Sequence, residues 1–419
     1  MTDSYCLSCN AMTDGEIKRI LDVAYEAGNI LLENGAEIAR VEETTARIAA
    51  AYGLSDSDFF VLSNGIFATA RGYAQVKFIP FKGTQMARVV AVNQLSRDIE
   101  SQHLPLDVVE QRLREIRTAK GLPAYEQILA SGLGSAAFCM IFGGGWIDSM
   151  VSFVVGVLLY FFVLYVAAPY MSKLMGNICG GALVTLLCIL SYKLGIGDSL
   201  GNMIIGAIIP LIPGVPFTNG VRDMANEDYI AGATRLLDAL LVFFCIAMGV
   251  CLVFLIDSRI EGVMIPLDGM HQSIETYHFA IQSVAAFVGT VAFAILFGVP
   301  HRYGVSCGLC GMAGWMLYMV LVRYAAFSPA EATFFSTILV ALSAHFTAKW
   351  RRCPVTVFLI CGIFPLIPGA GIFWTSYYIV SAQHATALAT GFSALKVAVA
   401  IVLGIFVLFE VMHHFRRHR

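Results

Sequence analysis

The side chains best suited to chemistry in this chain are a charged pair, Arg222 and Asp223, which follow the pentapeptide Pro-Leu-Ile-Pro-Gly at residues 210–214. A carboxyl group at the edge of an apolar interior can take up and release a proton, or pair with an arginine or a substrate ammonium. The sequence also allows a solvated loop that includes Glu227 and Asp228. The choice depends on whether the pair is buried.

Two neutral polar residues, Thr218 and Asn219, lie between the pentapeptide and the charged pair. Either is suited to cap a helix that restarts beyond the break, and the N-terminus of such a helix attracts a carboxylate. The pentapeptide itself frees backbone groups, because proline lacks an N–H donor and interrupts a helix. These residues therefore predict a polar site at a broken helix.

The same pentapeptide recurs at residues 365–369, where neutral polar and aromatic residues follow it. Interruptions at equivalent positions of two halves are typical of secondary transporters, whose broken helices surround a site in the middle of the membrane. We predict a substrate or ion path lined by Pro210, Pro213, Gly214, Thr218, Asn219, Arg222, Asp223, Pro365, Pro368, Gly369, Trp374 and Thr375.

The composition indicates the kind of protein that must position these residues. Of 419 residues, 58% are hydrophobic and 13% are charged, whereas soluble domains carry about 25% charged residues. This is the composition of a membrane protein, and a net charge of −2 gives no field that would attract nucleic acid. Ten apolar runs could span a lipid bilayer, at residues 128–146, 149–168, 174–192, 199–213, 230–256, 275–298, 304–323, 330–347, 354–367 and 388–411.

The chain contains an internal repeat. Shifting it by 155 residues, the distance between the pentapeptides, places residues 135–143 on residues 290–298 and Gly249 on Gly404. The same offset of 155 residues therefore aligns three separate parts of the chain. This predicts a duplicated five-helix unit at residues 124–258 and 274–419.

Five spans are an odd number, so the second unit is expected to be inverted in the membrane relative to the first. Residues 346–353 carry three cations, whereas the equivalent residues 191–198 carry one cation and one anion. The loops after the first span of each unit also support an inverted second unit, with Arg302 in residues 299–303 and no cation in residues 144–148. The loops after the second span do not distinguish the two orientations. The predicted fold class is an α-helical polytopic membrane protein of about ten transmembrane helices, in two inverted five-helix repeats with both termini cytosolic.

The first 123 residues are polar and predict a small soluble α+β domain that precedes the repeats. No secretory leader begins the sequence, and cations follow shortly before the first apolar run, so we expect this domain in the cytosol. Helical patterns flank Gly35 within residues 15–52 and recur at residues 91–101 and 106–119. Between them lie strand-like runs, separated by Asn64-Gly65 and Gly72, at residues 59–62, 66–70 and 75–79.

Motifs of catalysis are missing from the sequence: there is no nucleophile elbow, Walker loop, zincin pair or dinucleotide fingerprint. Cys6-x-x-Cys9 and Cys307-x-x-Cys310 have redox or zinc spacing, but no second pair accompanies either. We therefore expect no catalytic residue, no metal and no cofactor, with the proton gradient as the energy source.

The other charged residues near the spans have structural interpretations. Asp148, Asp198 and Glu331 are read as residues at the ends of loops. Arg235 and Asp238 have helical i,i+3 spacing and are interpreted as a pair at the start of the fifth span. A secondary transporter explains the whole pattern best. The rival classes are a membrane-anchored enzyme with its chemistry in the N-terminal domain, and a channel or regulatory scaffold.

Several segments together resemble the bacterial threonine/serine exporter family in its two-module form, namely residues 31–37, 40–43, 142–145, 180–183 and 213–223. The resemblance covers nearly the whole chain. It implies a multi-pass protein of the bacterial cytoplasmic membrane that exports L-threonine and L-serine by proton antiport. The wider family includes exporters of small dicarboxylates such as succinate, which is the alternative substrate class. The resemblance leaves open whether the protein forms a homo-oligomer.

Overall fold

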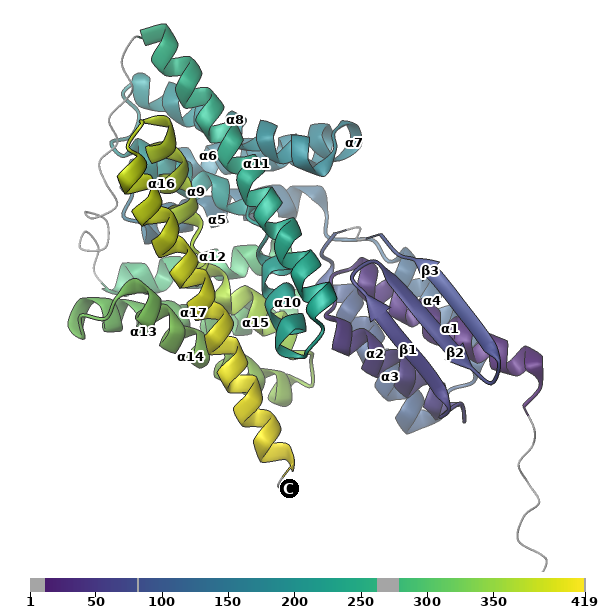
Figure 1. The fold of residues 1–419 in the computed structure, drawn as a ribbon. Helices are drawn as coiled ribbons and strands as arrows, with labels where there is room; N and C mark the ends of the chain where they lie inside the picture. The colour runs from purple at the N-terminus through teal and green to yellow at the C-terminus, as the bar shows by residue number, and fades with distance from the viewer. Residues whose placement is uncertain (1–11, 81–82, 262–278, 418–419) are drawn as a thin grey trace, which may run out of the picture. The chain divides into compact units, whose positions relative to one another are not determined.

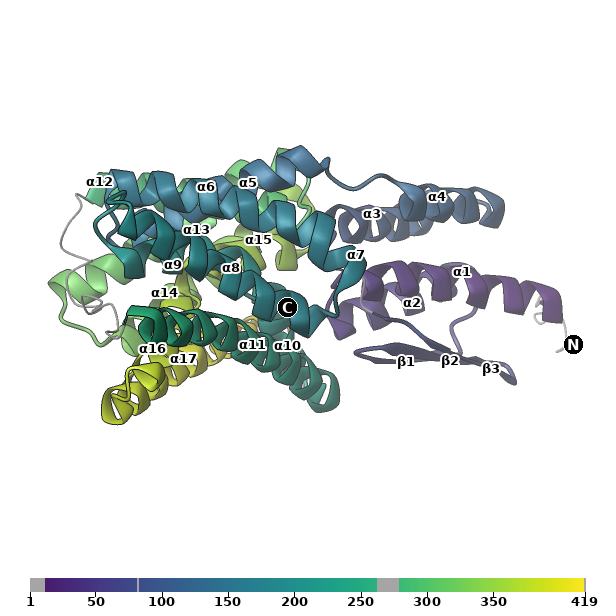
Figure 2. The ribbon, with the colours of Figure 1, turned by 90° about the horizontal axis from the view of Figure 1, so that it is seen from above.

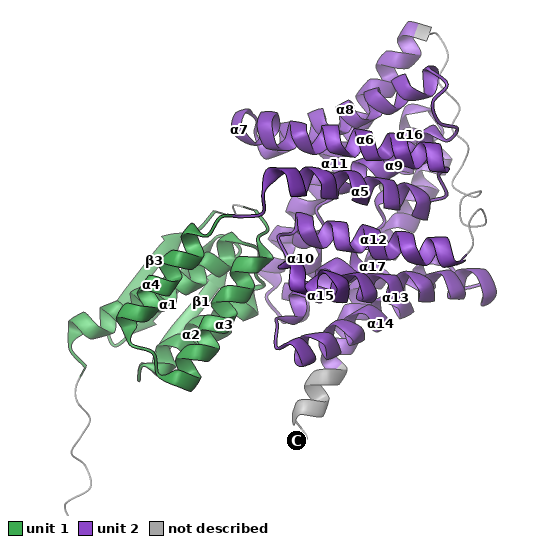
Figure 3. Ribbon diagram, turned by 180° about the vertical axis from the view of Figure 1, so that it is seen from behind, with its two compact units in different colours: residues 1–120 green, residues 121–419 purple. Residues whose placement is uncertain are grey.

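The computed structural model describes residues 12–80, 83–261 and 279–417. The chain divides into two compact units, one ending at Lys120 and the other beginning at Gly121 (Figure 3). Each unit has its own architecture: the first combines a small sheet with helices, and the second is helical.

The first unit is an α+β domain, which confirms the predicted class. Its elements, in chain order, are α1 (Asp14–Glu33), α2 (Ile38–Ala51), β1 (Ser57–Leu62), β2 (Gly65–Ala70), β3 (Tyr73–Phe78), α3 (Met86–Gln102) and α4 (Leu106–Thr118). The strands form an antiparallel sheet in the order β1-β2-β3. Figure 2 shows the sheet as one layer, α1 and α2 as the next, and α3 and α4 as the third.

Local sequence explains the ends of these elements. Thr13 caps α1 in a reciprocal box with Glu16, which satisfies two backbone N–H groups at the helix start. Arg71 and Gly72 both have positive φ, as a tight two-residue hairpin turn requires, and they join β2 to β3. The other hairpin turns one residue earlier than predicted, because Gly65 already pairs with Leu62.

The second unit begins with a five-element half. Its elements are α5 (Ala124–Ile141), α6 (Trp146–Phe162) continued by η1 (Val163–Ala167) and α7 (Ala168–Tyr170), α8 (Lys173–Lys193), α9 (Leu200–Ile208) with η2 (Ile209–Leu211) and α10 (Gly214–Ala225), and α11 (Tyr229–Glu261). The helix α9 and its continuation α10 meet at an angle of 63°.

The second half repeats this order, as Figure 1 shows in green and yellow. Its elements are α12 (Phe279–Leu296), α13 (His301–Tyr324), α14 (Pro329–Arg351), α15 (Val355–Ile363) with η4 (Phe364–Leu366) and α16 (Gly369–Val380), and α17 (His384–Arg417). Adding 155 to the bounds of α5, α9, η2 and α10 gives the bounds of α12, α15, η4 and α16. The sequence offset is therefore also an offset of helix ends and breaks.

The predicted count of ten spans is not reached. Among the described residues six helices are long and apolar enough to cross a bilayer, and the two bent pairs raise the number to eight. The helices α5 and α14 fall outside this set. Their mean hydropathy is lowered by Glu126 and Gln127 in α5 and by Glu331, His345 and Lys349 in α14.

Helix directions follow from contacts at their ends. Lys173 at the start of α8 pairs with Asp238 near the start of α11, at 2.5 Å, and Lys193 at the end of α8 pairs with Asp257 toward the end of α11. The helices α8 and α11 are therefore parallel. The bent segment between them must return once across the width of the bundle.

The two halves meet along α5 and α12, which cross in opposite directions. The side chain of Gln282 near the start of α12 donates a hydrogen bond of 3.4 Å to the carbonyl of Ile141 at the end of α5. Gly134 of α5 lies against Phe293, and the equivalent Gly289 of α12 lies against Phe138. The contact is thus reciprocal, as between the two sides of a symmetric interface.

Candidate functional site

The two pentapeptides fold into the same turn. In the first copy Ile212 N–H bonds to Ile209 O at 2.9 Å and Gly214 N–H to Ile212 O at 2.8 Å. Pro213 has φ −79° and ψ 60°, the geometry of an inverse γ-turn. Pro368 has φ −75° and ψ 47°, and Gly369 N–H bonds to Ile367 O at 2.7 Å. Each pentapeptide therefore ends one helix and starts another at a single bend.

The two bends lie against each other. A Cβ atom added to Gly214 would lie 2.6 Å from the ring of Phe364, and one added to Gly369 would lie 2.4 Å from Ile212 Cδ1. Both distances are shorter than van der Waals contact, so each pentapeptide needs its glycine for close approach to the other. The repeated motif thus brings the middles of the two halves together.

The charged pair after the first bend is buried in α10. Asp223 is 0% exposed and accepts a hydrogen bond of 2.6 Å from Arg235 Nη1 on α11. Arg222 is 5% exposed and donates to Thr356 Oγ1 on α15 at 2.6 Å. Its guanidinium lies 4.8 Å from the ring centroid of Phe409 on α17. The solvated-loop alternative is therefore wrong for this pair.

The remaining acids of this region lie in the turn between α10 and α11. Glu227 is exposed and has φ 69°. Burial raises the pKa of Asp228, and the positive charge of Arg235 opposes that shift. Arg235 thus faces Asp223 from inside the bundle and acts electrostatically on Asp228 at the turn.

Two sequence interpretations need correction. The residue that caps α10 is Pro213, without a side-chain bond, and neither Thr218 nor Asn219 caps the helix. Thr218 lies a turn inside the helix, where its hydroxyl donates to Gly214 O at 2.9 Å, because the γ-turn already sets the helix start. Arg235 does not pair with Asp238, because Asp238 bonds to Lys173 on α8 instead.

The equivalent helix α16 carries an aromatic cluster instead of charges. Trp374 packs with Tyr377 and Tyr378 at ring-centroid distances of 5.8 and 5.7 Å. Trp374 is 2% exposed and lies against Gly201 of α9. The hydroxyl of Thr375 donates to Gly371 O at 2.7 Å within α16. The hydroxyl of Thr375, one of the predicted path residues, therefore has a hydrogen-bond partner within its own helix.

Each restarted helix packs into the opposite half. In α10, Arg222 contacts Phe409 of α17, and the equivalent Tyr377 of α16 contacts Phe254 of α11 at 5.4 Å. Subtracting 155 from 409 gives 254, and subtracting 155 from 377 gives 222, so both contacts join equivalent positions. Sequence reasoning missed Thr356, Phe409 and Phe254, although the offset could have paired the last two.

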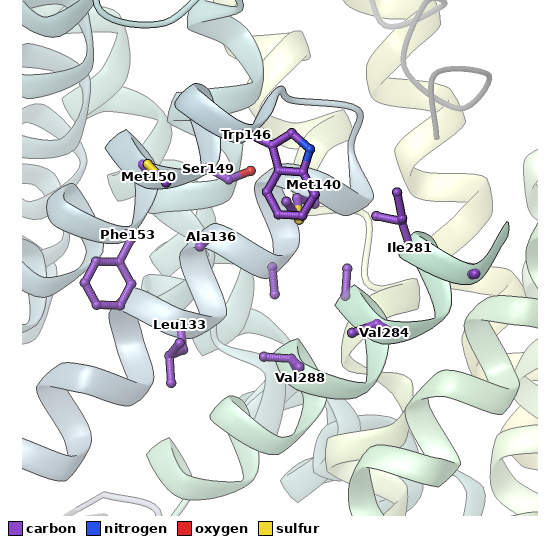
Figure 4. A pocket seen from close by; sticks show the side chains of 13 residues that line it. Leu133, Ala136, Met140, Trp146, Ser149, Met150, Phe153, Ile281, Val284 and Val288 are labelled. Atoms are coloured by element: carbon purple, nitrogen blue, oxygen red, sulfur yellow. The ribbon is translucent and has the colours of Figure 1, made fainter. Parts of the chain in front are cut away.

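A cavity of about 10 Å³ lies beside the two bends and α11, lined in part by Ile212, Gly369 and Ser376. Such a volume holds at most about one water molecule. A much larger groove of about 540 Å³ lies elsewhere, among α5, α6 and α12, and contains none of the predicted path residues (Figure 4).

Asp148 is more than the loop-end residue it was read as. Its carboxylate accepts hydrogen bonds from Gly145 N, Asp198 N and Ser199 N at 2.7, 2.8 and 3.2 Å. It therefore ties the start of α6 to the start of α9, the first part of the broken helix.

No group of three or more His, Cys, Asp or Glu side chains that could hold a metal occurs in the part of the chain that the structure describes. Cys307 and Cys310 are buried in α13. Cys6 and Cys9 lie outside the described residues.

Comparisons with known proteins match both halves of the chain. The family model described as "Putative threonine/serine exporter" matches residues 22–256, and the model described as "Threonine/Serine exporter, ThrE" matches residues 282–411. No solved structure matches the chain.

Curated relatives agree with these matches. The chain is 23% identical to the threonine/serine exporter of Corynebacterium glutamicum over 415 residues, covering 94% of this chain and 83% of that protein. It is also 23% identical to a probable threonine/serine exporter of Mycobacterium tuberculosis, covering 86% of this chain and 70% of that protein. A probable succinate transporter subunit, YjjP of Klebsiella aerogenes, is 26% identical, covering 56% of this chain and 93% of that subunit. The chain therefore belongs to the threonine/serine exporter family, in a form that carries two modules.

Proposed function

We propose that this protein is a secondary active transporter that exports threonine and serine across the bacterial cytoplasmic membrane in exchange for protons. The observation that carries the proposal is the pair of bent helices, at equivalent positions of two halves and in contact, with a buried Arg222 and Asp223 beside the first bend. Broken helices at a midplane site are the usual binding device of secondary transporters.

The proposal includes two halves of opposite orientation in the membrane. The antiparallel crossing of α5 and α12 supports it, because these are the first helices of the two halves. The parallel course of α8 and α11 supports counting each bent pair as one crossing. If α5 and α14 also cross, each half has five crossings and both termini would lie on the same side of the membrane. The cations of residues 346–353 favour the cytosol as that side.

A zwitterionic amino acid fits the groups beside the first bend. Arg222 would bind the carboxylate, because a guanidinium gives two parallel hydrogen bonds to a carboxylate. Asp223 would bind the ammonium when ionised, and the hydroxyl of Thr356 already accepts a hydrogen bond from Arg222. The cavity beside the bends is too small for an amino acid, so the proposal requires the bundle to open for the substrate to enter.

Asp223 is also the proposed proton carrier. In the structure it accepts a bond from Arg235, and a protonated carboxyl group would lose the attraction of that guanidinium. Proton binding would thus release α10 from α11. One charge moved across about 100 mV is worth roughly 2.3 kcal/mol, or about forty-fold in concentration, so one proton would drive substantial export.

A small dicarboxylate such as succinate is the second candidate substrate. Arg222 and Arg235, which bond to Thr356 and Asp223 in the structure, would bind the two carboxylates of such a substrate. The YjjP relatives are named as probable succinate transporter subunits. Both substrates share a carboxylate, so the same arginine would bind one end of either.

The test uses purified full-length protein in proteoliposomes with an imposed pH gradient. We expect labelled threonine and serine to move against their gradients when protons flow the opposite way, and succinate to move more slowly. Faster succinate flux would select the second candidate. The transporter proposal fails if none of the three compounds moves above protein-free vesicles under either direction of the gradient.

A further inference from the structure

The groove of about 540 Å³ among α5, α6 and α12 is not explained by the proposed transport site. Figure 4 shows side chains of all three helices around it, including Leu133 and Met140 of α5, Trp146 and Phe153 of α6, and Val284 of α12. The groove therefore lies at the seam between the two halves, where α12 of the second half meets α5 and α6 of the first.

The surface of the groove is entirely apolar. Ser149 is the polar residue among those that line it, and its side chain is nearly fully buried. Water in such a groove would find no hydrogen-bond partners, and an amino acid or dicarboxylate would leave its charges unsatisfied. An empty groove would forfeit dispersion contacts along all of its walls.

The surroundings of the groove indicate what fills it. The helices α6 and α12 are both apolar enough to cross a bilayer. Residues at the edges of the groove are apolar and exposed, with Met150 at 69% and Val284 at 62%. Trp146, at the start of α6, is 61% exposed, in the position where tryptophans sit at a membrane surface. The groove is thus continuous with a surface that faces hydrocarbon.

The equivalent place on the other side of the seam has a different lining. Trp146 and Ile281 line the groove, whereas their equivalents at an offset of 155 residues are His301 and Glu126, whose Nε2 and Oε2 atoms lie 3.2 Å apart. The groove is thus apolar where the equivalent place carries two polar side chains.

We propose that this groove binds an acyl chain of a bilayer phospholipid, held as a ligand at the seam between the two halves. This inference needs only that the second unit is embedded in a membrane, so it stands or falls independently of the transported substrate.

The experiment uses the full-length protein in phosphatidylcholine vesicles that contain a phospholipid with a photoactivatable diazirine on its acyl chain. After photolysis, peptides are mapped for attached lipid. We expect several-fold more label on residues 133–153 and 280–288 than on residues 240–248 of α11, which carry exposed apolar side chains and do not line this groove.

Two substitutions fill the groove from different helices, Ala136→Phe on α5 and Ala280→Phe on α12. Each should remove the excess label, whereas Ala389→Phe, the same change at an exposed position of α17, should preserve it. Equal labelling of groove and α11 peptides in the unsubstituted protein would overturn the proposal. A photo-crosslinking residue at Met150 that captures a second copy instead of lipid would also overturn it.

Discussion

The two bent helices share a backbone and differ in chemistry. The same five residues give the same γ-turn, the same helix start and reciprocal close approaches at Gly214 and Gly369. Beyond the turn, α10 carries a buried arginine and aspartate, whereas α16 carries a tryptophan and two tyrosines. The comparison separates what the break provides, a bend at the centre of the bundle, from what each half adds to it.

The partners of the two helices differ in how easily they can be exchanged. The polar side chains of α10 bond to Arg235 and Thr356, and these bonds are sensitive to protonation and to a bound carboxylate. The helix α16 belongs to the hydrophobic core of the first half, where Trp374 and Tyr377 pack with residues of α9 and α11. We infer that α10 changes its contacts during transport, whereas α16 keeps its packing.

The largest expected effect comes from Asp223→Asn. The amide cannot carry a proton at neutral pH, so threonine movement should no longer respond to a pH gradient, while threonine exchange is retained. Leaving Arg235 buried without its carboxylate costs roughly 3–5 kcal/mol, so thermal stability is measured in parallel.

Asp238→Asn is the matched control, because that carboxylate pairs with Lys173 at a partly exposed position. It should keep full coupling. Coupling that survives in Asp223→Asn, or that disappears in both variants, would contradict the assignment of Asp223 as proton carrier.

A smaller effect is expected from alanine at the glycines of the two bends. The added methyl of Gly214→Ala meets the ring of Phe364, which is stacked on Phe293 at 3.9 Å and has little room to move. In Gly369→Ala the methyl meets only the end of the Ile212 side chain. Overpacking typically costs about 1–3 kcal/mol, and we expect the first variant near the top of that range and the second near the bottom.

Thermal unfolding and transport rate in proteoliposomes measure this difference. Gly304→Ala on α13 serves as control, because its added methyl would lie 3.8 Å from Val291, an ordinary contact. Equal losses at Gly214 and Gly369 would show that the two bends are equally constrained, against the asymmetry described here.

Thr356→Val tests the contact between the halves at Arg222. The valine cannot accept the hydrogen bond that holds the guanidinium of Arg222 in position for a substrate carboxylate. The substrate concentration for half-maximal transport should therefore rise by about tenfold, equivalent to ~1.4 kcal/mol. Thr375→Val removes a hydroxyl that bonds within α16 and should leave that concentration nearly unchanged. A larger effect at Thr375 than at Thr356 would place the substrate beside α16.

The smallest effect is expected from Tyr378→Phe, which keeps the ring stacked on Trp374 at 5.7 Å and removes only the hydroxyl. Transport rate and coupling should both stay within about twofold, since substitutions that leave packing intact change free energies by roughly 0.5 kcal/mol or less. A loss of coupling in this variant would show that the Tyr378 hydroxyl takes part in transport. It would contradict the inference that only α10 supplies the polar groups of the site.

The sequence predicted the elements that depend on local patterns or on the repeat. The three strands, the helices around Gly35 and both breaks follow from turn residues and periodicity, and the offset of 155 carries over to the helix ends. It did not predict that Asp223 bonds to Arg235 and Arg222 to Thr356, because Arg235 lies beyond a turn on the next helix and Thr356 lies in the other half. The helices α5 and α14 were predicted as spans from the apolar runs at residues 128–146 and 330–347, but the polar residues in the full helices keep them out of the set of candidate spans.

The central claim is that threonine and protons move in opposite directions through one site. The most direct test loads proteoliposomes of the full-length protein with threonine and a pH-sensitive dye, and then dilutes them into threonine-free buffer without an imposed pH gradient. We predict that outward threonine flow drives protons inward and acidifies the lumen, and that Asp223→Asn abolishes the acidification. Threonine efflux without any change in internal pH in the unsubstituted protein would contradict the claim.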